Sequence, residues 1–383
     1  MNIHTVQFSH ILQTGELENL HAFLSRTAFV ISHKNESSEI LLRVLWYLPV
    51  DSPIIIVTNC QERERDALAS VLRTALAQHT RIYLVHQKDE TIARLFATYG
   101  VSHLLGPDNK VIDGKGEGMY IGALCAYQLE YPRWVIFYDA DNFVPSALLE
   151  YTLAMSRLFL QASLDGPARA SDPQMVQSQA GSSPAPLFLQ NVRICWSSKP
   201  GLGSGDWDAG IIGRCTRVVS PLFDALLEGW FGRRDHAIRS SNAGEQGMTI
   251  ETALALRFSA GFSVETLQLL DLLFHAMDGR SGVDGSVLVQ YQSQSPHFHE
   301  KKDDAHVKKM IEESLGSFFH FEAVLPDTVK RALQQVYAEL QLERVSPALY
   351  PPLGTLPVQR MAGWMDRYAL LAKVDCPEMQ LVE

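Results

Sequence analysis

The clearest chemical signal in the sequence is a pair of aspartates, Asp139 and Asp141, separated by Ala140. They follow the apolar run 134–138, which is typical of a buried β-strand. Carboxylates at positions i and i+2 can reach one Mg²⁺ or Mn²⁺, cations that take oxygen ligands and bridge phosphate oxygens. A solvated turn is the alternative, but the position after a buried strand favours a metal-assisted reaction on a phosphate-containing substrate.

A glycine-rich segment, 113–118, precedes a predicted helix over 119–129. Glycines allow the backbone to come close to a ligand, Lys115 adds a positive charge, and amides at a helix start can face an anion. The segment is not a P-loop, because Gly116 follows the lysine where Ser or Thr should stand. It predicts a diphosphate site, with an ordinary glycine turn as the alternative.

Two further clusters carry residues suited to anions or metals. The first, 213–217, has two arginines and a threonine at the start of a predicted helix, which suits a phosphate or carboxylate. The second, 295–300, contains two histidines, and either could complete a metal shell begun by Asp141. A solvated helix cap and ordinary surface histidines are the respective alternatives.

These clusters need a scaffold, and the first 145 residues predict one. Apolar runs separated by helical patterns indicate a mostly parallel sheet covered by helices on both faces; they lie at 28–32, 54–57, 82–85 and 134–138. Ligands bind such sheets at the carboxyl ends of the strands. Polar clusters follow each run at these ends, at 33–36, 58–59, 86–89 and 139–142.

The rest of the chain divides by composition. Residues 162–186 are rich in Ala, Ser, Pro, Gly and Gln and predict a mobile insertion. Strands are expected at 192–196 and 286–291, and helices at 250–258 and beyond 303. The predicted parts are an N-terminal extension, a nucleotide-binding half, an acceptor-binding half and a C-terminal helical region, at 1–25, 26–145, 146–320 and 321–383.

Composition excludes several classes of protein. The 383 residues are 46% hydrophobic and carry a formal net charge of −10, which argues for a globular chain and against nucleic-acid binding. No apolar run approaches the roughly 20 residues of a membrane span, and no signal peptide is recognisable. The five cysteines are far apart and form no CxxC pair. A soluble, cytoplasmic protein without a membrane partner is expected.

Five segments in this order resemble the mannosyl-3-phosphoglycerate synthases: VISHKNE at 30–36, VHQKD at 85–89, GKGEGM at 114–119, FYDADNFVP at 137–145 and PHFHE at 296–300. The resemblance spans about residues 26–320 and implies the GT-A fold of nucleotide-sugar glycosyltransferases, with a C-terminal helical extension. Neither the N-terminal 25 residues nor the 162–186 insertion has a counterpart in it.

The resemblance also implies a reaction and residue roles. The reaction would be retaining transfer of mannose from GDP-mannose to 3-phosphoglycerate, in the synthesis of the compatible solute mannosylglycerate, with Mg²⁺ or Mn²⁺ as cofactor. The donor would lie near Ser32, Glu36, Asn59, Gln87 and Ala140, with Lys115 on its diphosphate. Asp139 and Asp141 would be catalytic, Asp141 the metal ligand together with His297 or His299.

For the acceptor, related glucosyl-3-phosphoglycerate synthases use a turn that Gly213, Arg214 and Thr216 match. They also place a glutamate near the sugar, for which Glu251 is preferred here over Glu245. Retention by front-face return is favoured over a double displacement, since no carboxylate other than Glu251 suggests itself as a nucleophile.

Three other hypotheses remain open. The donor could be GDP- or UDP-glucose, which makes a glucosyl-3-phosphoglycerate synthase. The protein could be a sugar-phosphate nucleotidyltransferase, although that class expects a glycine-rich loop after the first strand, and HKNESSE has no glycine. It could also be a non-catalytic binding module. A homodimer is a hypothesis from family habit, with Trp364 and Tyr368 as a contact surface or as packing on the main domain.

Overall fold

The computed structural model describes residues 2–7, 18–34, 36–142, 144–165, 187–198, 212–235, 238–278, 283–298 and 303–372. Most of the predicted insertion, residues 166–186, lies outside them, as does His299. No helix in these ranges is both long enough and apolar enough to cross a membrane.

One large sheet organises the molecule. In the part of the chain that the structure describes, its nine strands lie in the order β1-β9-β6-β7-β5-β2-β3-β4-β11. β7 runs antiparallel to β5 and β6, and β11 antiparallel to β4; the other pairings are parallel. The strands are β1 (Asn2–Gln7), β2 (Thr27–His33), β3 (Ile54–Thr58), β4 (Arg81–His86), β5 (Trp134–Asp139), β6 (Leu187–Cys195), β7 (Gln246–Thr249), β9 (Val283–Gln292) and β11 (Ala369–Ala372).

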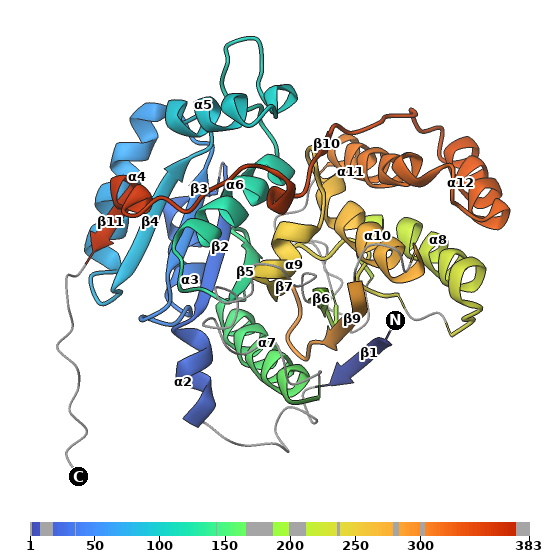
Figure 1. The fold of residues 1–383 in the computed structure, drawn as a ribbon, viewed down its shortest axis with the longest axis horizontal. Coiled ribbons are helices and arrows are strands. Elements are labelled where there is room, and N and C mark those ends of the chain that lie inside the picture. The colour runs from blue at the N-terminus through green and yellow to red at the C-terminus, as the bar shows by residue number, and fades with distance from the viewer. Residues whose placement is uncertain are drawn as a thin grey trace, which may run out of the picture.

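Helices cover both faces of the sheet, so the α/β prediction is confirmed (Figure 1). Alternate residues of β2 show the two layers: Ala28 and Val30 join one hydrophobic core, Phe29 and Ile31 the other. The second core includes side chains from α2 (Glu18–Leu24), α3 (Ser38–Leu45), α4 (Glu62–Ala75) and α7 (Pro145–Asp165). The first includes α5 (Glu90–Thr98), α6 (Lys115–Gln128), α8 (Arg214–Phe231), α9 (Ile250–Ala255), α10 (Ser263–Asp278), α11 (Asp304–Gly316) and α12 (Asp327–Glu339).

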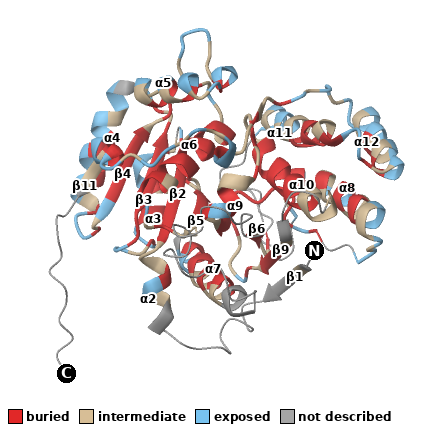
Figure 2. Cartoon of the chain, in the orientation of Figure 1, coloured by how far each residue is buried: buried red, intermediate tan, exposed pale blue. Residues whose placement is uncertain are grey.

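Helix α6 is buried along almost its whole length, as Figure 2 shows by its red colour. It packs against β2 and β3 on one side and against α9 and α10 on the other. At Gly122 an added Cβ would overlap Val30, so the helix lies directly on the sheet. This close packing fixes the position of the helix start, where Lys115 stands.

The C-terminal region is helical only in part, which corrects the predicted extension. After α12 the chain forms β10 (Leu349–Tyr350), paired with β8 (Phe258–Ser259), and then runs back across the molecule to β11 at the edge of the main sheet (Figure 1). Trp364 and Tyr368 are buried on this path, and the Tyr368 hydroxyl donates to Asp89 Oδ1 over 3.0 Å. Both aromatic residues therefore pack on the main domain and are not an exposed contact surface.

The N-terminal segment also differs from a simple extension. Residues Asn2–Gln7 form β1, which pairs in parallel with β9 at the edge of the sheet. β1 was not recognisable in the sequence because a single edge strand carries little periodic signal of its own.

The helix predicted over 250–258 is shorter in the structure, because α9 ends at Ala255 and β8 follows.

Candidate active site

The predicted polar clusters meet at the carboxyl edge of the sheet. Ser32 on β2 lies opposite Asp139 on β5 in the strand register. The backbone continues the pairing just beyond the strands, where Asn59 N donates to His33 O (2.9 Å) and Gln87 N donates to Thr58 O (2.8 Å). Four segments far apart in the sequence thus form one surface, as the parallel-strand interpretation predicted.

Lys115 is the centre of this surface. Its amine forms an ion pair with Asp139 and lies 2.5 Å from Glu265 Oε1 on α10. The side chain of Glu265 is only 5% exposed and that of Lys115 14%. Burial alone would lower the pKa of the Lys115 amine, but the charges of Asp139 and Glu265 outweigh it and raise the pKa. Lys115 therefore stays protonated in the folded protein.

The glycines around Lys115 serve the fold rather than an open loop. Lys115 begins α6, so residues 115–118 of the glycine-rich segment form the first helical turn, and the helix starts earlier than the predicted residue 119. Gly116 N donates to Gly261 O (2.9 Å), and a Cβ at Gly116 would overlap the carbonyl oxygen of Ser259. The space that the sequence suggested for a ligand is here filled by protein backbone.

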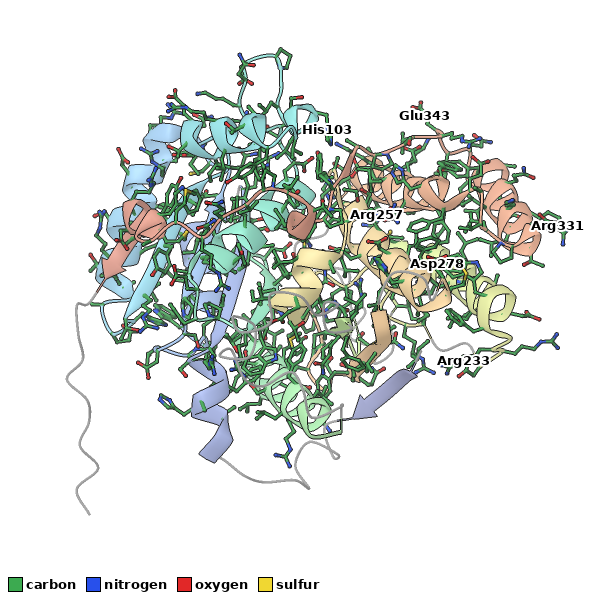
Figure 3. The ribbon with its side chains drawn as sticks, viewed as in Figure 1. His103, Arg233, Arg257, Asp278, Arg331 and Glu343 are labelled. Carbon is green, nitrogen blue, oxygen red and sulfur yellow. The ribbon has the colours of Figure 1, made fainter. Side chains whose placement is uncertain are left out.

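Glu117, within the same turn, is a buried carboxylate that no sequence motif singled out. It accepts hydrogen bonds from the Tyr350 hydroxyl (2.6 Å) and from Gly261 N (3.1 Å). Burial raises the pKa of this carboxyl, and the hydrogen bonds partly oppose the shift. Figure 3 labels His103 close to β10, where its Nε2 lies 3.0 Å from Leu349 O. The C-terminal segment thus helps to hold the start of α6.

Segment 242–245 closes the site from the other side. A Cβ at Gly244 would overlap Asp139 and lie 2.8 Å from the Lys115 amine, so the backbone passes directly over this ion pair. Glu245 follows, with no exposed surface. Its Oε2 accepts from Trp196 Nε1 (3.0 Å), and its Oε1 lies 3.3 Å from His297 Nδ1.

Glu251, the preferred sugar-side glutamate, lies elsewhere, and this prediction is wrong. β7 runs antiparallel to β5, so Gln246 pairs with Phe137 but Thr249 pairs with Trp134 at the amino end. Glu251 comes two residues later, exposed in the first turn of α9, at the opposite edge of the sheet from Asp139. Of the two glutamates considered, Glu245 is the one that the fold places at the carboxyl edge.

The other predicted donor residues take defined positions. Glu36 folds back so that its Oε2 accepts from Lys34 N (2.8 Å). Gln87 is buried and donates from Nε2 to Ile112 O (2.7 Å) and Gly114 O (3.2 Å), which fixes the segment before α6. Asn59 makes a side-chain hydrogen bond with Asp113.

Asp141 and His297 are the described residues that were predicted to bind the metal ion. Asp141 is partly exposed just beyond β5, whereas Ala140 is buried in the core. His297 is buried, 1% exposed, and its ring lies 4.8 Å from that of Trp196. Among the described residues, no group of three or more His, Cys, Asp or Glu side chains is arranged to hold a metal.

The predicted acceptor residues lie at the start of α8. Gly213 is the N-cap residue, Thr216 is buried in the first turn, and Arg214 Nη1 donates to Asp304 Oδ1 (2.8 Å) at the start of α11. This helix start connects to the Lys115 site through two short contacts. Cys215 Sγ lies 3.6 Å from Ser314 Oγ, which accepts from Asn242 Nδ2 (2.9 Å), two residues before Gly244.

Other arginines have structural roles or lie away from the site. Arg193 is fully buried and donates to Ser240 O (2.9 Å), Gln246 Oε1 (2.9 Å) and Glu265 O (3.0 Å), and burial lowers its pKa to about 10. Arg257, labelled beside α10 in Figure 3, donates from Nε to Asp271 Oδ1 (2.8 Å). Arg233 and Arg331 lie at the outer rim in the same view.

The fold and the site together define a class of protein. A mostly parallel α/β sheet carries a lysine and paired aspartates at its carboxyl edge, an arrangement suited to binding and cleaving a diphosphate ester.

Comparison with known proteins identifies the family. The family model of mannosyl-3-phosphoglycerate synthase matches residues 2–365, so the chain belongs to this glycosyltransferase family. The mannosyl-3-phosphoglycerate synthase of Pyrococcus furiosus is 28% identical over 332 residues, covering 83% of this chain and 78% of its own. That of Aeropyrum pernix is 27% identical over 362 residues, covering 92% and 86%.

Solved structures with similar folds are more distant. The mannosyl-3-phosphoglycerate synthase from Rubrobacter xylanophilus is 14% identical, covers 92% of this chain and 95% of its own, and has a TM-score of 0.48. The glucosyl-3-phosphoglycerate synthase from Mycobacterium tuberculosis, in complex with phosphoglyceric acid, is 15% identical, covers 92% and 98%, and has a TM-score of 0.46. At these TM-scores the overlap is too loose to assign residue roles.

Proposed function

We propose that the protein transfers mannose from GDP-mannose to 3-phosphoglycerate, with retention at the anomeric carbon and with a divalent cation as cofactor. The observation that carries this proposal is the ion pair of Lys115 with Asp139 at the carboxyl edge of the sheet, in a chain that belongs to the mannosyl-3-phosphoglycerate synthase family. Cleavage of the sugar–phosphate bond concentrates negative charge on the leaving diphosphate. A protonated lysine held at that place supplies a positive charge where this negative charge develops.

Asp141 is the residue proposed to hold the cation, since its carboxylate is partly exposed beside Asp139. A bound Mg²⁺ or Mn²⁺ would neutralise charge on the diphosphate oxygens. His297 can offer only its Nε2 atom to the cation, because its Nδ1 atom faces the Glu245 carboxylate. Glu245 is then a positioning residue that sets the orientation of the His297 ring. His299 stays a prediction.

The acceptor site is proposed at the start of α8. 3-Phosphoglycerate is a small polyanion, and an acidic protein must gather positive charge locally to bind it. Arg214 and the amides at the helix start supply this charge next to segment 242–245, which covers the Lys115 site. The Asp304 carboxylate paired with Arg214 has a fully exposed side chain and can give way to the substrate.

Front-face return is the proposed route to retention. A double displacement requires a carboxylate beneath the anomeric carbon. Glu251, the candidate for that role, lies at the opposite edge of the sheet, and Glu245 is buried against Trp196 and His297. In front-face return the leaving diphosphate takes the proton of the acceptor hydroxyl, so no such carboxylate is required.

The test is a donor panel with purified full-length protein. GDP-mannose, GDP-glucose and UDP-glucose are each incubated with 3-phosphoglycerate, with EDTA and with added Mg²⁺ or Mn²⁺. We expect release of GDP from GDP-mannose only, restored after EDTA by a divalent cation, and an α-linked product by NMR. In a parallel incubation of GTP with mannose 1-phosphate, release of pyrophosphate would indicate a nucleotidyltransferase. Faster turnover of a glucosyl donor would indicate a glucosyl-3-phosphoglycerate synthase.

A matched pair of variants separates enzyme from binding module. Asp141→Ala should abolish GDP release, whereas Asp66→Ala, at an exposed position on α4, should not change it. Unchanged GDP release by Asp141→Ala would contradict the proposed metal site. A cytoplasmic location and a homodimer stay predictions, and light scattering that gives a monomer mass at micromolar concentration would contradict the dimer.

A further inference from the structure

Three polar side chains form a cluster beside the proposed diphosphate site. Asn59 follows β3, Lys88 follows β4, and Asp113 lies two residues before Lys115. Lys88 Nζ is 2.9 Å from Asp113 Oδ1, and Asn59 makes a side-chain hydrogen bond with the same carboxylate. We call these three residues the Asp113 cluster.

The carboxylate of Asp113 is ionised and held in place. Burial alone would raise its pKa, but the hydrogen bonds from Lys88 and Asn59 and the charge of Lys88 lower it overall. Its backbone is fixed on both sides, because Gln87 Nε2 donates to the carbonyls of Ile112 and Gly114. The Asp113 side chain is still 48% exposed, and a carboxylate has about four acceptor positions, so it can accept further hydrogen bonds.

The spacing between the cluster and Lys115 fits a nucleotide. Asp139, which pairs with Lys115, ends β5, and the sheet continues β5-β2-β3-β4. Asn59 and Lys88, at the ends of β3 and β4, are therefore two to three strand spacings from Asp139, about 10–14 Å, and the Asp113 carboxylate meets Lys88 there. An extended nucleoside diphosphate spans a similar length, so a diphosphate at Lys115 places its base at the Asp113 cluster.

The chemistry of the cluster matches one base. Guanine has two adjacent donors, N1–H and the exocyclic N2–H₂, next to the acceptor O6. A carboxylate can accept from both donors at once, while a lysine amine donates to O6. Uracil has a single N–H between two carbonyl oxygens, so the second oxygen of a carboxylate would face a carbonyl and repel it.

We propose that Asp113 is the residue that selects guanine in the donor nucleotide, with Lys88 on O6 and Asn59 orienting the carboxylate. This inference rests on the proposed function and adds the basis of its nucleotide specificity. Glu36 and Asp89 also lie near these strand ends, but both are already engaged. Glu36 Oε2 accepts from Lys34 N and closes the turn after β2, and Asp89 Oδ1 accepts from the Tyr368 hydroxyl and from backbone amides at the start of α5.

The test measures binding of GDP, IDP and UDP to the full-length protein by isothermal titration calorimetry. IDP has no exocyclic amine, so the ratio of the Kd for IDP to that for GDP reports the N2 contact alone. For the wild-type protein we expect GDP to bind about tenfold more tightly than IDP, the lower part of the range for a charged hydrogen bond. Asp113→Asn should bring this ratio close to one and weaken GDP relative to UDP.

Control variants make the result specific. Asp108→Asn, on the exposed turn before Lys110, should keep the wild-type ratio. Lys88→Met should weaken GDP and IDP together, because both carry O6, and should keep their ratio. A thermal melt of each variant checks folding, and Lys88→Met provides an independent test if Asp113→Asn does not fold.

The outcomes separate this inference from the proposed function. A wild-type protein that prefers UDP to GDP would contradict both. A preference for GDP over UDP with equal binding of GDP and IDP would overturn the inference alone. It would also be overturned if Asp113→Asn kept the wild-type ratio, if Glu36→Gln lost it instead, or if Lys88→Met bound GDP as tightly as wild type.

Discussion

The amine of Lys115 and the carboxylate of Glu265 lie 2.5 Å apart, although 150 residues separate them in the sequence. Asp139 contacts the same amine from β5. One buried positive charge therefore joins the start of α6, the start of α10 and the end of a central strand. The diphosphate site is proposed at this junction.

Glu265→Gln should destabilise the protein, because it removes one of the two carboxylates that neutralise Lys115. We expect the free energy of unfolding to fall by about 1–3 kcal/mol, the cost of leaving a buried group incompletely paired. Urea denaturation measures it. The control is Glu228→Gln, whose surface pair with Arg234 should contribute at most about 1 kcal/mol. Equal losses in the two variants would contradict a special role for Glu265.

Lys115→Met should lower kcat strongly, because the leaving diphosphate loses its positive partner. Removal of one group that stabilises a developing charge typically lowers kcat by about 10²–10³-fold. GDP release at saturating donor measures the effect. The control is Lys110→Met, which removes a lysine shortly before the glycine-rich segment. It should change kcat less than about twofold, within the scatter of surface substitutions. A small effect in Lys115→Met would place the diphosphate elsewhere.

Gly116→Ala should destabilise the protein, whereas Gly118→Ala should not. At Gly116 the new methyl group would overlap the Ser259 carbonyl, so α6 or β8 must move, and we expect a loss of about 1–3 kcal/mol. At Gly118 the methyl group would lie 3.5 Å from Ser32 Oγ, an ordinary contact. Alanine is favoured over glycine in a helix by up to about 1 kcal/mol, so stability should stay equal or rise. Thermal melts of both variants provide the comparison, and similar melting temperatures would argue against the close approach at Gly116.

Glu245→Gln and Glu251→Gln test which glutamate belongs to the site. Loss of the charge beside His297 should lower kcat/KM by about 10–100-fold, as is typical for residues that orient a ligand side chain. Glu251 is exposed at the opposite edge, so its variant should keep wild-type kinetics. The reverse result would mean that the sequence-based choice of Glu251 was correct. A shifted Mn²⁺ dependence in Glu245→Gln would distinguish positioning of His297 from a purely structural role.

Acid should destabilise the protein in part through His79. The residue is fully buried, and burial lowers its pKa below the ordinary 6.5. Above pH 6.5 both the folded and the unfolded chain carry a neutral ring, so His79 adds no pH dependence. As the pH falls below 6.5, the unfolded chain binds the proton first, and the free energy of unfolding decreases by up to about 1.4 kcal/mol per pH unit.

Replacement of this histidine should remove that contribution. The free energy of unfolding of His79→Leu, measured by urea denaturation between pH 7 and 5, should depend less steeply on pH than that of the wild type. His21→Leu, at an exposed position of α2, should keep the wild-type slope. Parallel slopes for all three proteins would show that His79 is not responsible for the acid sensitivity.

Much of the architecture could be predicted from local patterns. Short apolar runs such as 54–57 mark strands buried on both faces, and polar residues at their carboxyl ends mark the ligand-binding edge. The Asp-x-Asp pair could be placed at this edge for the same reason, because parallel strands bring their carboxyl ends together. Lys115 starts a helix and was assigned to the same site only through the family resemblance. The buried, apolar character of a strand is a local property, so the sequence contains it directly.

Three features depended on tertiary structure. Glu265 carries no local signal that it pairs with Lys115, since only the packing of α10 against α6 brings the two together. The choice between Glu245 and Glu251 depended on the antiparallel direction of β7, which places the two glutamates at opposite edges of the sheet. Gly116 has no room for a side chain because the Ser259 carbonyl of β8 lies against it, a contact between segments about 140 residues apart.

The sequence alone therefore determined which residues could do the chemistry and at which edge of the sheet they meet. The three-dimensional arrangement decided which of them touch, because the direction of β7 and the packing of α10 and β8 on α6 are long-range interactions with no periodic signature.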